Sequence, residues 1–179
     1  FNLNMHTARL LMREPFFAAL SRRIDKIAST AIPTAGVRVN PDSAQFEMLY
    51  NPTFFSKLTD AERRDVLKHE FYHIIFLHVT DRLPEGANMK LWNVATDLAI
   101  NSHLFNLPEG GLIPGIAPFE NLPRGQSSEW YLANLPDFNK QGGKSGPPGD
   151  EEGKSKNSPS DSSGDNGSDG ESDAADDDF

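Results

Sequence analysis

The stretch TDAERRDVLKHEFYHIIFLHVTDR, residues 59–82, decides the fold of this chain. Thr59 followed three positions later by Glu62 is typical of a capping box at the start of a helix. The stretch contains neither Gly nor Pro, and its apolar residues recur at helical spacing. The sequence therefore predicts one long helix over residues 59–82, the strongest helix of the chain.

The middle of this helix carries the motif H-E-x-x-H, formed by His69, Glu70 and His73. Positions i and i+4 of a helix lie on the same face, so both imidazoles can bind one zinc ion. Glu70 is offset by one position and can take a proton from a water as general base. Asp65, one turn before His69, is expected to be an exposed acid, and a role in orienting the ligands is the alternative. The alternative to a metal site is that these histidines lie on the helix surface and make ordinary hydrogen bonds.

A catalytic zinc site needs a third protein ligand, and the next predicted helix, residues 88–105, offers one. Asn93, Asp97 and Asn101 follow one another at intervals of four on an otherwise apolar helix. We expect Asp97 to be the third ligand, with Asn93 and Asn101 orienting the ligands or nearby backbone. The alternative is a polar stripe that only binds helix caps and loop backbone.

Other residues are weaker candidates for the same site. If the first helix continues to residue 82, His78 lies half a turn out of phase with His69 and points away from the metal. His103 is another possible third ligand. Tyr72, His103 or Arg82 could donate a hydrogen bond to a developing oxyanion, but the spacing favours none of them.

The remaining ordered segments predict a mainly helical α+β domain with a small β-sheet. Residues 7–12 and 15–27 have the pattern of one or two amphipathic helices, with Pro15 in a first helical turn. Residues 37–40 and 45–51 alternate with period two around a turn, which indicates an antiparallel pair. Residues 127–135 form a last short helix, capped by Ser127 or Ser128.

Composition divides the 179 residues into two parts. Residues 1–140 are nearly neutral and form one domain, whereas residues 141–179 carry eleven acidic and three basic side chains with almost nothing apolar. Such a segment cannot bury enough surface to offset its chain entropy. We therefore expect residues 141–179 to be a disordered acidic tail or linker.

The same composition excludes several classes of protein. A domain without a basic surface is not expected to bind nucleic acid, and no apolar stretch approaches the roughly 20 residues that span a bilayer. Cysteine is absent, which excludes disulfides and thiolate ligands and is consistent with a cytoplasmic protein. The first residue is Phe1 rather than Met, so we expect a piece of a longer chain.

These motifs, in this order, resemble the metallopeptidase domain found upstream of von Willebrand A-like domains in bacterial and phage proteins. The resemblance implies a zincin-like metal site at His69 and His73, with Glu70 as catalytic acid/base and Asp97 as a further ligand. It also implies a MoxR-type AAA+ ATPase and a von Willebrand A-like module as partners. The segments that carry it lie within residues 7–135: ARLLMREPFFAALSRRI, YNPTFFSKLTDAERRDVLKHE, HEFYHIIFLHVTDR, WNVATDLAIN, LPEGGLI and SSEWYLANL.

The function expected from the sequence is hydrolysis of peptide bonds by a zinc-activated water. An extended peptide could pair with a strand edge beside the metal, for which residues 45–50 are the candidate. Two alternatives stay open. One is a non-proteolytic, zinc-stabilised adaptor that works with the ATPase or the von Willebrand A-like partner. The other is a zinc hydrolase of a different bond, such as an amide in a small molecule.

Overall fold

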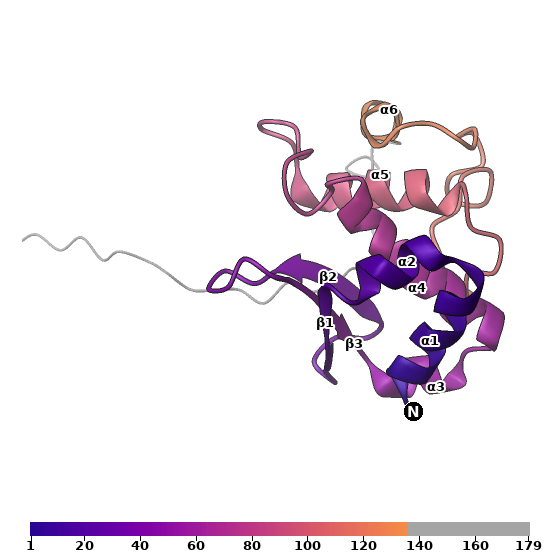
Figure 1. The fold of residues 1–179 in the computed structure, drawn as a ribbon. Helices are drawn as coiled ribbons and strands as arrows, with labels where there is room; N and C mark the ends of the chain where they lie inside the picture. The colour runs from indigo at the N-terminus through magenta and orange to yellow at the C-terminus, as the bar shows by residue number, and fades with distance from the viewer. Residues whose placement is uncertain (136–179) are drawn as a thin grey trace, which may run out of the picture.

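The computed structural model describes residues 1–135, which form six α-helices and three β-strands (Figure 1). The mainly helical α+β class with a small sheet is confirmed. The predicted boundary at residue 140 and the predicted tail, residues 141–179, lie outside the described residues. The helices are α1 (Leu3–Arg13), α2 (Pro15–Ser21), α3 (Pro52–Lys57), α4 (Asp60–Ile75), α5 (Met89–Asn101) and α6 (Ser128–Asn134). The strands are β1 (Ile24–Ala28), β2 (Ala35–Val39) and β3 (Phe46–Tyr50).

Side-chain caps fix the start of each helix that bears on the site. The Thr59 hydroxyl accepts from the Glu62 backbone N–H at 3.3 Å, and the Glu62 carboxylate accepts from the Thr59 N–H at 2.7 Å. The predicted capping box of α4 is thus confirmed. The Asn88 side chain caps α5, and Ser127 caps α6. Local sequence therefore sets where these helices begin.

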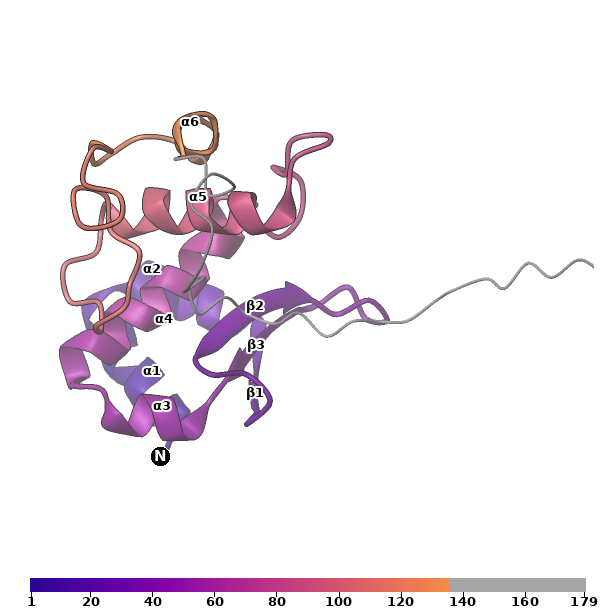
Figure 2. The same cartoon turned by 180° about the vertical axis from the view of Figure 1, so that it is seen from behind.

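The sheet has the strand order β1-β3-β2. β2 and β3 are antiparallel, as the sequence predicts, with Val37 opposite Met48. β1 pairs with the other side of β3 in parallel, with Ile24 opposite Phe46. The prediction of a free edge on residues 45–50 is therefore wrong, because β3 is the middle strand. β2 is an edge strand, and it contacts α4 (Figure 2).

β1 occupies a segment for which the sequence predicts helix. The helix expected over residues 15–27 ends at Ser21, and the chain becomes extended from Ile24. Ile24 and Ile27 are three positions apart, which fits a helix face, but β-branched residues also favour strands. Pairing with β3 decides between the two. The short helix α3 was not expected, although Asn51 followed by Pro52 is a typical helix start.

α4 ends at Ile75, seven residues earlier than predicted. The His78 N–H bonds the His73 carbonyl at 2.9 Å, and the Leu77 N–H bonds the Ile74 carbonyl at 3.1 Å. This pair of bonds is a Schellman motif, whose left-handed position is taken by Leu77 at φ 59°. Glycine usually occupies that position. Because Leu77 stands there instead, the sequence gives no signal that the helix ends.

Two hydrophobic clusters lie on either side of the contact between α4 and α5. The first joins α1, α2, α3 and α4 with the sheet, and it includes Phe55, Leu67 and Phe71. The second joins α5, the loop that follows it and α6, and it includes Leu98 and Tyr131. Both views show α5 crossing between α4 and α6 (Figures 1 and 2). No helix within residues 1–135 is long and apolar enough to cross a membrane.

Candidate metal centre

Two histidines of α4 point toward the same place. His69 and His73 are one turn apart, and their Nε2 atoms lie 3.0 Å from each other. The apolar side of α4, with Leu67 and Phe71 fully buried, is held in the first cluster. This packing leaves both imidazoles facing α5, with side-chain exposures of 15% and 13%.

α5 brings Asp97 to this pair of imidazoles. Its Oδ1 lies 3.4 Å from Nε2 of His69 and 3.2 Å from Nε2 of His73. Within the described residues these three side chains form a group able to hold a metal ion. The fold thus brings Asp97 to His69 and His73, as the two sequence motifs predict, although Asp97 lies 24 residues after His73 in the chain.

The three atoms fit the corners of a zinc site. Tetrahedral zinc with bonds of about 2.0–2.1 Å separates neighbouring ligand atoms by about 3.3 Å, which is close to the measured 3.0, 3.2 and 3.4 Å. Three protein ligands leave one tetrahedral corner for water or substrate. The Asp97 side chain is 31% exposed, so solvent can reach the group from this side.

The outer nitrogen of His69 has a fixed partner. Its Nδ1 lies 2.7 Å from Oδ1 of Asn101, while the Asn101 amide nitrogen donates to the Leu112 carbonyl at 2.8 Å. The bond to Leu112 identifies Oδ1 as the amide oxygen, so His69 donates its Nδ1–H to Asn101. Asn93 shares the stripe with Asn101, but its side chain is exposed and makes no hydrogen bond to either histidine.

Electrostatics couple the three groups strongly. Burial alone would lower the pKa of His69, but the hydrogen bond and charge of Asp97, aided by Glu70 and Asn101, raise it to about 9. Burial lowers the pKa of His73. Burial would raise the pKa of Asp97, but the two histidines hold it below its usual value. The directions of these shifts favour an anionic Asp97 carboxylate beside a protonated His69.

Glu70 lies next to this group on α4. Its residue exposure is 6%, and its negative charge is one of the influences that raise the pKa of His69. A buried carboxylate beside two candidate ligands is suitably placed for proton transfer, the role that the motif assigns to it.

Three other sequence candidates make no hydrogen bond to any of the candidate metal ligands within the described residues. His103 is exposed beyond the end of α5. The Arg82 guanidinium pairs with both oxygens of Glu129 at 2.7 Å, and Tyr72 stacks on Phe76. Arg82 and Tyr72 thus have structural partners of their own.

Two residues have positions that the sequence did not predict. Asp65 is 5% exposed rather than a surface acid, and it accepts hydrogen bonds from Phe105 and Asn106 after α5. His78 lies against His73 instead of pointing away, with 3.3 Å between their Nδ1 atoms. The turn at Leu77 accounts for the difference. It ends the helix before His78, so His78 does not have the orientation that a continued helix would give it.

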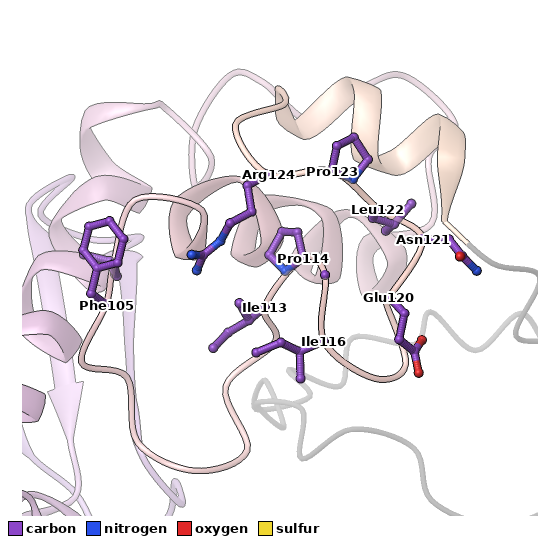
Figure 3. A pocket seen from close by; sticks show the side chains of 11 residues that line it. Phe105, Ile113, Pro114, Ile116, Glu120, Asn121, Leu122, Pro123 and Arg124 are labelled. Atoms are coloured by element: carbon purple, nitrogen blue, oxygen red, sulfur yellow. The ribbon is translucent and has the colours of Figure 1, made fainter.

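A separate cavity of about 940 Å³ lies between the end of α5 and the loop before α6 (Figure 3). Its lining is largely apolar, with one base and one acid, Arg124 and Glu120, and it contains no histidine. Ile113 lines it directly after Leu112, whose carbonyl holds Asn101. The cavity therefore lies next to the segment whose backbone holds the Asn101 side chain.

A family model described as "Putative metallopeptidase domain" matches residues 2–178 of the chain. The chain belongs to this family. No curated protein and no solved structure matches it. Membership in a metallopeptidase family agrees with the metal-ligating character of the group formed by His69, His73 and Asp97.

Proposed function

We propose that this domain is a zinc peptidase in which His69, His73 and Asp97 hold the ion and Glu70 moves the proton. The observation that carries the proposal is the convergence of two imidazole nitrogens and one carboxylate oxygen within 3.4 Å of one another. Two nitrogen ligands and one carboxylate favour zinc over calcium or magnesium, which prefer oxygen ligands.

The chain's own residues have distinct tasks in this proposal. A bound zinc would supply Lewis acidity, lowering the pKa of a water toward roughly 7 and polarising the scissile carbonyl. Glu70 takes the proton from the attacking water and returns it to the leaving amine. Asn101 holds His69 so that its Nε2 lone pair faces the ion.

A peptide substrate is supported by the position of β2. This strand, Ala35–Val39, is at the edge of the sheet and is the strand that contacts α4. An edge strand presents backbone N–H and C=O groups with which an extended peptide can pair. We propose that β2, in place of residues 45–50, guides the substrate past the histidines. The ATPase and the von Willebrand A-like partner remain predictions from the resemblance.

The test is Glu70→Gln, which keeps the shape of the side chain but removes its basicity. We expect hydrolysis of denatured proteins or a peptide library to fall by about 10²–10⁴-fold, with zinc content and thermal unfolding unchanged. Glu109→Gln is the matched control, because Glu109 is exposed in the loop after α5. Wild-type proteolysis by folded, zinc-loaded Glu70→Gln would falsify the proposed mechanism.

A further inference from the structure

His78 is a buried histidine to which the proposed mechanism gives no task. It is 7% exposed, and its Nδ1 lies 3.3 Å from the Nδ1 of His73. The Schellman turn that ends α4 causes this contact, because the motif brings its last residue, His78, back onto His73. The Trp92 ring packs edge-on against the His78 ring, with 5.9 Å between the two ring centroids.

The hydrogens along this contact follow from the chemistry of imidazole. A neutral histidine that offers Nε2 to a metal carries its hydrogen on Nδ1, and that N–H needs an acceptor. For His69 the acceptor is Asn101. For His73 the atom opposite is Nδ1 of His78, which can accept only if His78 carries its own hydrogen on Nε2.

The other end of His78 satisfies this requirement. Its Nε2 lies 3.0 Å from the hydroxyl oxygen of Ser128, which can accept the Nε2–H. Ser128 is the first residue of α6 and is 1% exposed. The bond is therefore shielded from water. A single arrangement of hydrogens then gives an acceptor both to the His73 Nδ1–H and to the His78 Nε2–H.

We propose that His78 and Ser128 are positioning residues that lock His73 in its metal-binding tautomer, with Nε2 free for the ion. This inference rests on the proposed metal centre, but it does not depend on what the centre hydrolyses. The two histidines would then be held from different helices. Asn101 of α5 holds His69. Ser128 of α6 holds His73 through His78.

The experiment compares His78→Leu with His78→Asn in the full chain, with His103→Leu as the matched control. Asn retains an acceptor near the position of the imidazole Nδ1, whereas Leu fills the space without one. Zinc affinity is measured by competition with a chromophoric chelator, and folding by thermal unfolding. We expect His78→Leu to weaken zinc binding by about 10–100-fold, while His78→Asn stays within about threefold of wild type.

A second measurement needs no variant and therefore does not depend on the folding of His78→Leu. Long-range ¹H–¹⁵N NMR of the zinc-loaded wild type should find the His78 hydrogen on Nε2 and the His73 hydrogen on Nδ1. A His78 hydrogen on Nδ1, or wild-type zinc affinity in folded His78→Leu, overturns the inference alone. Stoichiometric zinc without proteolysis overturns only the proposed function, whereas a wild type that binds no zinc overturns both.

Discussion

At the scale of single residues, the candidate centre depends on which ring nitrogen each histidine presents. The Nε2 atoms of His69 and His73 face Asp97, and their Nδ1 atoms face Asn101 and His78 respectively. Buried polar groups need partners, so the proposed site depends on these outer contacts as well as on the three candidate ligands.

Asp65 shows the same requirement one turn earlier on α4. Burial would raise the pKa of its carboxyl, but hydrogen bonds from Asn106 and Phe105 and the charge of Arg64 lower it instead. A carboxyl whose folded pKa is lowered stabilises the fold above its unfolded pKa, and this contribution is lost as the pH falls through the folded pKa. Asp65 should therefore stabilise the domain at neutral pH and cease to do so in acid.

We predict that Asp65→Asn lowers the free energy of unfolding at pH 7 by about 1.5–3 kcal/mol, since it weakens hydrogen bonds to a charged group. The difference from wild type should shrink below about pH 4, where the unfolded carboxyl is protonated. Urea unfolding at pH 7, 5 and 3 measures both effects. A difference that stays constant over this range would show that the charge of Asp65 contributes nothing.

At the scale of elements, the way in which α4 ends determines where His78 lies relative to the candidate metal centre. The Schellman motif stops the helix after Ile75 and turns the chain so that His78 meets His73. Leu77 holds the left-handed position of this turn at φ 59°, where a side chain costs about 1–2 kcal/mol relative to glycine. The turn is therefore strained at a residue whose side chain is half exposed.

We predict opposite effects for two substitutions at Leu77. Leu77→Gly should keep or raise the free energy of unfolding by up to about 1 kcal/mol, because glycine adopts positive φ freely but loses more entropy on folding. Leu77→Val should lower it by about 1–2 kcal/mol, since β-branched residues are poorly tolerated at positive φ. Urea denaturation curves of the two variants compare them directly. Equal destabilisation by both would mean that lost side-chain packing, not backbone conformation, dominates.

At the scale of the whole molecule, the candidate centre lies where the two hydrophobic clusters meet. The histidines belong to α4 of the first cluster, and Asp97 belongs to α5 of the second. A cation held by all three would therefore tie the two clusters together. Two contacts join the same helices or their ends without a metal: Asp65 of α4 accepts from Asn106 after α5, and Arg82 after α4 pairs with Glu129 of α6.

We predict that zinc stabilises the whole domain. Zinc at a hundredfold excess over its Kd should add about 2.7 kcal/mol, which raises the Tm by on the order of 10 °C. Calorimetry with zinc and with a chelator measures this shift. Asp97→Ala should lose most of it, because the variant lacks the proposed third ligand. If Asp97→Ala keeps the full shift and stoichiometric zinc, then Asp97 is not a ligand.

Sequence alone determined the local parts of this protein. Spacing put His69 and His73 on one face of a helix, and the stripe on α5 singled out Asn93, Asp97 and Asn101. Of these three, Asn93 is exposed and does not bond to either histidine. Caps marked the starts of α4 and α6 correctly. These features depend on residues within one or two helical turns, for which periodicity and capping are sufficient evidence.

Tertiary structure decided what depends on distant partners. Pairing with β3 turned Ile24–Ala28 into a strand, and burial against Phe105 and Asn106 gave Asp65 its role. A Schellman turn without glycine placed His78 between His73 and Ser128. His78 and Ser128 are fifty residues apart in the chain. The physical reason is the same in all three cases. The free energy of a strand, a buried charge or a buried imidazole depends on its partner, and the local sequence does not show which residue that partner is.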